Sequence, residues 1–205
     1  MTAATFLLAT RSPGKMRELR ALFAESGRSI VSLDEVGLAV ERAEDELETA
    51  ETFEENALRK ARYFHVRSGL ATVADDSGLV VLAVGGAPGV RSKRWSERPD
   101  LGGQALDDAN NALLQERLTG VADRRARYVC AAAFSDGSGS FVERGTVEGR
   151  ITAEARGANG FGYDPYFVSD ELGMTFGAAS REEKARVSHR ARAFTKLLRR
   201  IDALR

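Results

Sequence analysis

Two adjacent carboxylates, Asp75 and Asp76, follow the apolar run 70–74 and precede Ser77 and Gly78. Neighbouring side chains of an extended segment point to opposite sides, so the two aspartates need not share a role. A carboxylate beyond the end of a strand in an α/β protein can hold Mg²⁺ or act as a general base. The alternative is an Asp-rich turn without function, but two acids after a buried run favour the functional interpretation slightly.

The turn before the first helical pattern offers an anion-binding site. It comprises Thr10, Arg11, Ser12, Pro13, Gly14 and Lys15. A helix N-terminus after such a turn presents unpaired amides, and Lys15 adds a positive charge, so the segment suits phosphate. The spacing of a Walker A loop is absent. Taken alone, the segment favours the plainer interpretation of a capped helix start with an exposed lysine.

Acidic residues and a lysine in the region 44–60 can complete a metal and phosphate site. The acids are Glu44, Asp45, Glu46, Glu48 and Glu51. Magnesium sites in phosphate chemistry use one or two carboxylates with phosphate oxygens and water, so one of these acids can be the partner of Asp76. Lys60 lies in the helical pattern that follows. For each of these residues taken singly, a solvated surface charge is the more common role.

A second glycine-rich segment, 157–165, can bind a base. It contains Phe161, Gly162, Tyr163 and Asp164. An aromatic ring between glycines can stack on a flat base, and a carboxylate can accept hydrogen bonds from base edges. The alternative is a tight turn whose rings fill the core.

Donors near the C-terminal end can bind phosphate or a base carbonyl. They are Lys184, Ser188, His189 and Arg190. The chain has two histidines. His65 lies in the middle of a helical pattern and is expected to be structural, so His189 is the better functional candidate.

Hydrophobic spacing predicts the elements that must position these segments. Strands are expected at 6–9, 29–33, 70–74, 127–134, 139–151 and 166–168. Helices are expected at about 16–23, 52–68 and 107–118, and from 181 onward with a break near Ser188. Capping boxes begin at Thr52 and Ser180. Because helices alternate with strands early and a hairpin follows at 136–138, the pattern predicts an α/β fold with a mixed sheet.

The composition is that of a globular protein without a surplus of charge. The 205 residues suit a single domain, 1–205, or two small, closely associated lobes. Lys plus Arg and Asp plus Glu number 30 each, which argues against general nucleic-acid binding. The lone Cys130 allows no intramolecular disulfide and is expected to be buried and inert. No signal peptide and no membrane-spanning stretch is apparent, so we expect a cytoplasmic protein.

Taken together and in this order, the segments resemble the inosine/xanthosine triphosphate pyrophosphatase family. The matching stretches are 9–15, 48–61, 74–79, 85–90 and 160–165, with Lys184 and 188–190. The resemblance covers nearly the whole chain. It implies an elongated α/β protein whose mixed sheet has flanking helices, with two lobes around a central cleft, and it implies a homodimer.

The resemblance also implies catalytic roles. Glu48 and Asp76 would hold Mg²⁺, and Asp76 would also be the general base, supported by Asp75. Lys60 would neutralise phosphate charge that develops during the reaction, and Ser77 would contact the substrate.

The remaining segments would bind the substrate. The turn 10–15 would cradle the triphosphate, and 161–164 with Lys184, His189 and Arg190 would grip the base and phosphates. Two residues depart from the family pattern. Ser12 stands where the family usually has Asn, and Ala50 where it usually has Gly. Neither change removes a charge, so we expect activity to survive, with phosphate binding weakened at Ser12.

The implied activity is hydrolysis of ITP, dITP and XTP to the monophosphate and pyrophosphate, by attack of water on the α-phosphorus. Donors facing the 6-keto group would reject adenine, whose amino group is itself a donor. His189 and Arg190 are the candidates for this selection. Two alternatives stay open: a pyrophosphatase for another base, such as a modified pyrimidine, and a nucleotide sensor without turnover. The acids and Lys60 argue against the sensor.

Overall fold

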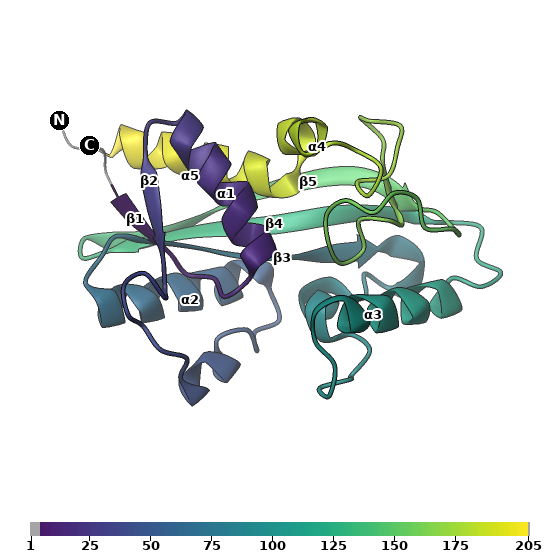
Figure 1. Ribbon diagram of the computed structural model, residues 1–205, viewed down its shortest axis with the longest axis horizontal. Coiled ribbons are helices and arrows are strands. Elements are labelled where there is room, and N and C mark those ends of the chain that lie inside the picture. The colour runs from purple at the N-terminus through teal and green to yellow at the C-terminus, as the bar shows by residue number, and fades with distance from the viewer. Residues whose placement is uncertain (1–4, 205) are drawn as a thin grey trace. The chain divides into compact units, whose positions relative to one another are not determined.

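The computed structural model describes residues 5–204 and shows helices on both faces of a mixed sheet (Figure 1). The strands are β1 (Thr5–Leu8), β2 (Ser29–Ser32), β3 (Thr72–Val81), β4 (Arg125–Asp136), β5 (Gly139–Ile151) and β6 (Phe167–Ser169). The α-helices are α1 (Pro13–Glu25), α2 (Phe53–Ser68), α3 (Gly103–Arg117), α4 (Arg181–Val187) and α5 (His189–Ala203). Short 3₁₀ helices cover Arg42–Glu46, Leu82–Val84 and Gly89–Arg94.

The six strands form one sheet in the order β2-β1-β3-β4-β5-β6. Strand β1 pairs in parallel with both β2 and β3, whereas β5 and β6 are antiparallel. The connection from β4 to β5 is a tight hairpin, in which the Asp136 carboxylate accepts from the amides of Ser138 and Gly139. The predicted α/β class and mixed sheet are therefore confirmed.

The chain divides into two compact units. The first consists of Met1–Asp76, Cys130–Gly145 and Arg190–Arg205, and the second of Ser77–Val129 and Thr146–His189. The strands β3, β4 and β5 contribute residues to both units. The single-domain organisation expected from chain length stays a prediction.

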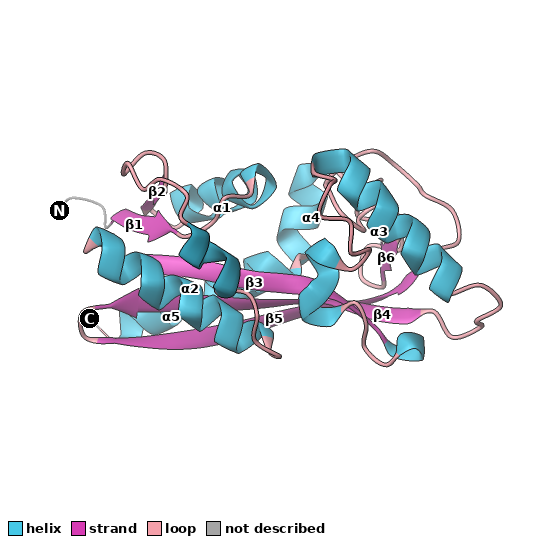
Figure 2. Ribbon diagram, turned by 90° about the horizontal axis from the view of Figure 1, so that it is seen from below, coloured by secondary structure: helices cyan, strands magenta, loops and turns pink. Residues whose placement is uncertain are grey.

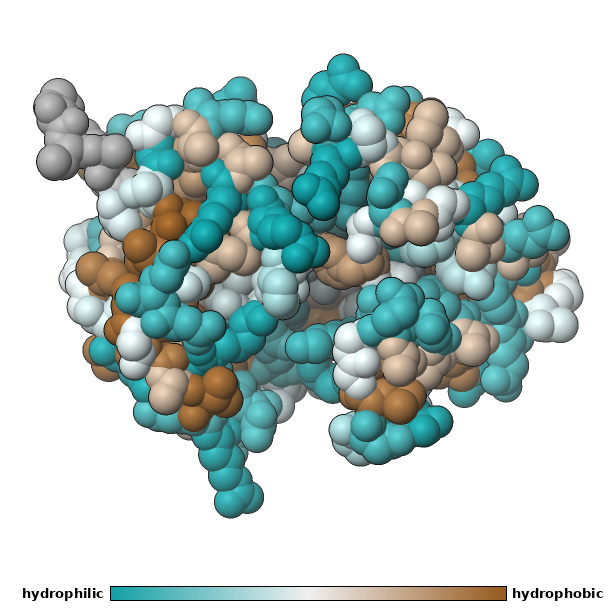
Figure 3. Space-filling model, viewed as in Figure 1, coloured by the Kyte–Doolittle hydropathy of each residue, from teal (hydrophilic) through white to brown (hydrophobic). Residues whose placement is uncertain are grey.

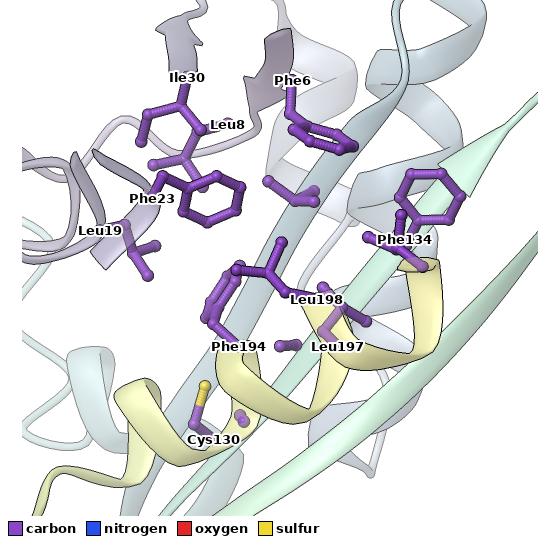
Figure 4. Close-up of a cluster of buried hydrophobic side chains, with 14 residues drawn as sticks. Phe6, Leu8, Leu19, Phe23, Ile30, Cys130, Phe134, Phe194, Leu197 and Leu198 are labelled. Carbon is purple, nitrogen blue, oxygen red and sulfur yellow. The ribbon is translucent and has the colours of Figure 1, made fainter. Parts of the chain in front are cut away.

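The core of the first unit packs α1 and α5 against one face of the strands, while α2 lies on the other face (Figures 1 and 2). Four phenylalanines form its centre, each in edge-to-face contact with a neighbour (Figure 4). They are Phe6, Phe23, Phe134 and Phe194. The thiol of Cys130 is buried in this cluster, as the sequence predicts.

The second unit has its own core, in which aromatic rings from three segments meet. Tyr128 of β4 lies 4.7 Å from the Phe167 ring centroid and stacks on Phe176 at 5.8 Å. Leu114 and Leu118, at the C-terminal end of α3, are fully buried in the same cluster. Outside the cores, Figure 3 shows hydrophilic side chains over much of the visible face, with hydrophobic ones in small patches between them.

The helix boundaries follow the caps that the sequence predicts. The amide of Glu55 donates to Thr52 Oγ1 (3.2 Å), and a complete capping box at Ser180 starts α4. Ser188 is the extended residue at which α4 ends and before which α5 begins, so the expected break is confirmed. No helix among residues 5–204 is long and apolar enough to cross a membrane.

One predicted boundary is wrong. The strand expected to end at Ala74 continues to Val81, so Asp75 and Asp76 lie within β3 and not in a turn after it. The strand runs between β1 and β4, and the backbone ladder persists because the two buried carboxylates find partners in side chains of neighbouring helices. Tertiary contacts here override the turn preference of Asp, Ser and Gly.

Replacing Phe194 by Ala tests the core of the first unit. The ring is fully buried and contacts Phe23, so its removal leaves a cavity that should lower the free energy of unfolding by about 3–5 kcal/mol. Urea titration followed by circular dichroism measures this loss. Leu204→Ala, at a position 70% exposed, is the matched control and should change stability by less than about 0.5 kcal/mol.

Candidate active site

Strand β3 presents its two carboxylates to opposite faces of the sheet. Asp75 is fully buried and contacts Lys15 of α1 (3.0 Å) and Arg190 of α5 (3.2 Å). Asp76 accepts a hydrogen bond from Asn56 of α2 (2.8 Å). The alternation of side chains along an extended strand therefore separates the aspartates, as the sequence predicts.

The Asp75 side is a closed network of charges. Burial alone would raise the pKa of Asp75, but Lys15 and Arg190 outweigh it and hold that pKa well below its usual range. The guanidinium of Arg190 also contacts Glu18 of α1. Burial raises the pKa of the Cys130 thiol, whose sulfur lies 3.9 Å from Asp75 Oδ2, so this cysteine is protonated and unreactive. Asp75 is thus a permanently ionised residue that links α1, β3 and α5.

On the α2 side, Lys60 connects the acidic stretch to β3. Its ammonium donates to Glu48 Oε1 at 2.5 Å and to the backbone carbonyl of Asp75. Burial lowers the pKa of Lys60, but the negative charges of Glu48, Asp76 and Asp75 outweigh burial and raise it. The side chain is therefore cationic and held in place, as a group that stabilises phosphate charge must be.

Asp76 differs from Asp75 in its electrostatics. Burial raises its pKa, Lys60 and Lys15 lower it, Glu48 raises it further, and the net direction is upward. A carboxyl with a raised pKa is a better proton acceptor at neutral pH, and added positive charge would favour its ionised form. The two sides of β3 thus carry one acid stabilised as an anion and one that is not.

The oxygen ligands near Lys60 fit a magnesium ion. Glu48 and Asp76 are close enough that each shifts the pKa of Lys60, and both supply the hard carboxylate oxygens that Mg²⁺ prefers. Residues 5–204 contain no cluster of three or more acidic, His or Cys side chains that could hold a metal by themselves. Two carboxylates suffice where substrate phosphates and water complete the octahedron.

The turn 10–15 forms a capped helix start beside this network. Ser12 is the N-cap of α1, because its hydroxyl accepts from the amide of Lys15 (3.4 Å), and Pro13 begins the helix. Thr10 Oγ1 accepts from the Ser12 amide at 3.1 Å. The segment thus presents the N-terminus of a 13-residue helix, with the Lys15 ammonium on Asp75.

Arg11 of the same turn is bound by acidic side chains. Its guanidinium donates to Glu44 (2.8 and 3.2 Å) and to Asp34 (2.9 Å). The contact connects the turn to the acidic stretch, in which Glu44 also belongs to the cap of a 3₁₀ helix. A phosphate contact by Arg11 stays a prediction, and in this structure the residue orders the loop 41–46.

The glycine-rich loop of the second unit centres on Asp164. Its carboxylate accepts from the Phe161 amide (2.9 Å) and from Lys184 Nζ (2.7 Å). The Lys184 ammonium also lies 5.1 Å from the centroid of the Phe161 ring, which is 36% exposed. A Cβ on Gly160 would lie 2.0 Å from Asp164 Oδ2, so glycine is required at that position.

Two predicted binding residues of the second unit are buried in its core. The hydroxyl of Tyr163 donates to the Ser92 carbonyl (2.8 Å), and burial raises the pKa of this phenol. His189 stacks on Tyr128 with ring centroids 4.7 Å apart, and only 4% of it is exposed. Ser77 is half-buried within β3. Substrate contacts by these three residues stay predictions.

The structure also adds residues that the sequence did not single out. Asn56 orients Asp76, and Glu18 binds Arg190. Asn56 is one helical turn before Lys60, and Glu18 one turn after Lys15, so helical spacing was the available signal. Arg190, predicted with His189 to select the base, belongs to the first unit and pairs with Asp75, and its contact with substrate stays a prediction.

Comparison with known proteins places the chain among nucleotide pyrophosphatases. The Ham1 family model matches residues 6–200. A dITP/XTP pyrophosphatase of Exiguobacterium sp. is 45% identical over 192 residues, which cover 93% of each chain. One from Mycolicibacterium paratuberculosis is 46% identical over 204 residues, which cover 97% of this chain and 96% of that protein.

Solved structures agree with these matches. A Ham1 protein of Staphylococcus aureus superposes with a TM-score of 0.81 at 33% identity, over 98% of this chain and 100% of that one. A nucleoside-triphosphatase (dITP/XTP pyrophosphatase) of Mycobacterium abscessus gives a TM-score of 0.72 at 43% identity, over 95% and 98% of the two chains.

Neutralisation of the two aspartates should cost unequal amounts of stability. Asp75→Asn leaves Lys15 and Arg190 without their shared anion, so the free energy of unfolding should fall by about 3–5 kcal/mol. Asp76→Asn removes a charge that burial disfavours and should cost less than about 1 kcal/mol. Urea titration of both variants at neutral pH, without divalent metal, measures the difference. Equal losses would contradict this division of roles.

Proposed function

Because the chain belongs to the Ham1 family, we propose that it hydrolyses non-standard purine nucleoside triphosphates. The substrates would be ITP, dITP and XTP, and the products the monophosphate and pyrophosphate. The relatives described above carry the name dITP/XTP pyrophosphatase. The observation that carries the proposal is the pair of carboxylates on β3, with Lys15 on one side and with Lys60 and Glu48 on the other.

The reaction proposed is direct attack of water on the α-phosphorus, with pyrophosphate as the leaving group. Asp76, whose pKa is raised by burial, would accept the proton of the attacking water. Asn56 holds this carboxylate in one orientation. Cys130, the chain's one cysteine, is buried and its pKa is raised, so it is not the nucleophile.

The charges around β3 would stabilise the transition state. Glu48 and Asp76 would hold Mg²⁺, which supplies positive charge to the phosphate oxygens when bound. Lys60 and Lys15, both held by carboxylates, provide positive charge that needs no rearrangement during the reaction. The N-terminus of α1, with its first-turn amides, would bind the phosphates.

The base would be recognised by the second unit. The exposed ring of Phe161 is available to stack on a purine, and Lys184 lies within reach of the ring and of Asp164. Donors that face the 6-keto group would discriminate against adenine. Assembly as a homodimer, residence in the cytoplasm and the absence of nucleic-acid binding belong to the same proposal, the last supported by the zero net charge.

A substrate panel tests the activity. Purified protein with Mg²⁺ should release pyrophosphate from ITP, dITP and XTP. We expect kcat/KM to be at least about 10²-fold above that for ATP and GTP, because a base with the wrong polar groups leaves groups of the site unpaired. A coupled pyrophosphate assay measures the rates. Preference for a modified pyrimidine would overturn the base assignment, and tight binding without release would identify a sensor.

Three acid-to-amide variants test the proposed roles of the carboxylates. Asp76→Asn should lower kcat by about 10²-fold or more, the usual contribution of a general base. Glu48→Gln should raise the Mg²⁺ concentration needed for half-maximal activity, and EDTA should abolish activity reversibly. Asp45→Asn, an exposed acid of the same stretch, is the matched control. Unchanged Mg²⁺ dependence in Glu48→Gln would exclude it as a ligand.

A further inference from the structure

Two side chains of α3 hold the peptide groups of a single glycine in the base-binding loop. The Gly162 amide donates to Asp107 Oδ2 (2.7 Å), and the Gly162 carbonyl accepts from Asn111 Nδ2 (2.9 Å). Asp107 and Asn111 are four residues apart, so they lie on the same face of α3 one turn from each other. We propose that this pair, the Asp107–Asn111 clamp, positions the Phe161 ring for substrate. The inference rests on the proposed function.

The chemistry of the clamp fixes its orientation. A carbonyl only accepts, so the group of Asn111 that faces Gly162 must be the amide nitrogen. Asn111 is only 5% exposed, so its contact with the Gly162 carbonyl is shielded from solvent. Asp107 meets the N–H as a carboxylate, which makes the stronger, charge-assisted kind of hydrogen bond.

The position of Asp107 is unfavourable for a carboxylate in other respects. Burial raises its pKa and the negative charge of Asp164 raises it further, while the Gly162 amide lowers it. Asp107 is a second carboxylate near Asp164, and packing alone does not explain why a charged residue occupies this position. The hydrogen bond to the Gly162 amide favours the charged form more than the positive charge of Lys93 does.

The clamp completes the restraint of Phe161 on its C-terminal side. On the N-terminal side, the Phe161 amide donates to Asp164, which Lys184 holds in turn. Gly160 and Gly162 both have positive φ angles, of 79° and 62°. Phe161 therefore lies between two residues in left-handed conformations, and each neighbouring peptide is tied to a side chain outside the 160–163 turn.

Restraint of this kind matters because glycine has the most backbone freedom to lose. Fixing one residue costs about 1–2 kcal/mol, so a loop that is already ordered binds its ligand more tightly. A ring that is mispositioned in the free protein would weaken substrate binding more than it would slow the chemical step. The clamp should therefore affect KM and leave kcat nearly unchanged.

The first test compares variants of the clamp in the ITP assay. Asp107→Ala removes the acceptor, and Asn111→Asp places an oxygen against the Gly162 carbonyl, so each should raise KM about tenfold, corresponding to a hydrogen-bond loss of about 1.4 kcal/mol. In both, kcat should stay within about twofold. Asp107→Asn keeps an acceptor and should restore most of the affinity. Asp108→Ala, at an exposed position where the carboxylate accepts a hydrogen bond from Gln104, is the matched control.

A second measurement needs no substrate. Amide hydrogen exchange over 160–164 in the nucleotide-free protein should be faster in Asp107→Ala and Asn111→Asp than in the parent or in Asp108→Ala. Unchanged exchange would overturn the clamp itself. Faster exchange with unchanged KM would overturn its role in binding.

Phe161→Ala separates failure of the clamp from failure of the base assignment. If this variant raises KM while the clamp variants do not, the proposed function stands and the inference about α3 is wrong. If Phe161→Ala leaves KM unchanged, the ring does not contact the base, and the proposed function needs another base site.

Discussion

The buried charge of Asp75 is the constraint on which the first unit depends. A carboxylate in the middle of a sheet needs nearby positive charge, and here it receives Lys15 from α1 and Arg190 from α5. These contacts tie the first and last helices of the chain to the same strand. A buried ion pair adds little net stability, but loss of one partner is costly, so the network strongly disfavours arrangements in which either helix is displaced.

Asp75 pairs with the cations of α1 and α5 on one face of the sheet. Asp76 points to the other face and has different neighbours. Asn56 and Lys60, on successive turns of α2, meet Asp76 and the peptide carbonyl before it. Adjacent residues of one strand thus differ in the direction of their pKa shifts, although both are almost fully buried. The pleat of β3 thus gives a two-residue motif one carboxylate held as an anion and one with a raised pKa, the proposed general base.

Local patterns predicted the elements well, and the site only in part. The N-cap at Thr52, the capping box at Ser180 and the break at Ser188 are local signals, and the structure shows each of them. Of the box predicted at Thr52, the structure shows the bond from the Glu55 amide to the Thr52 hydroxyl. The end of β3 was misjudged because the partners that allow Asp75 to be buried lie far away in the sequence. Arg190 and His189, adjacent in the chain, were predicted to share one role. In the structure they belong to different units and have different partners, and the shared role stays a prediction. Whether His189 and Arg190 belong to one site depends on the direction in which each side chain points after the helix break at Ser188.

The same physical logic operates in the glycine-rich loop of the second unit. Glycines allow the left-handed turns that present Phe161, but they also make the turn costly to order. Asp107 and Asn111 of α3, together with Asp164, offset this cost by hydrogen bonding to peptide groups of the loop. Lys184 of α4 in turn holds the Asp164 carboxylate. In both units, polar side chains on helices hold a segment in place: β3 in the first unit and the loop around Gly162 in the second. Under the proposed function, the residues that order this loop lie partly on α3, outside the loop itself, where a search for binding motifs would not look for them.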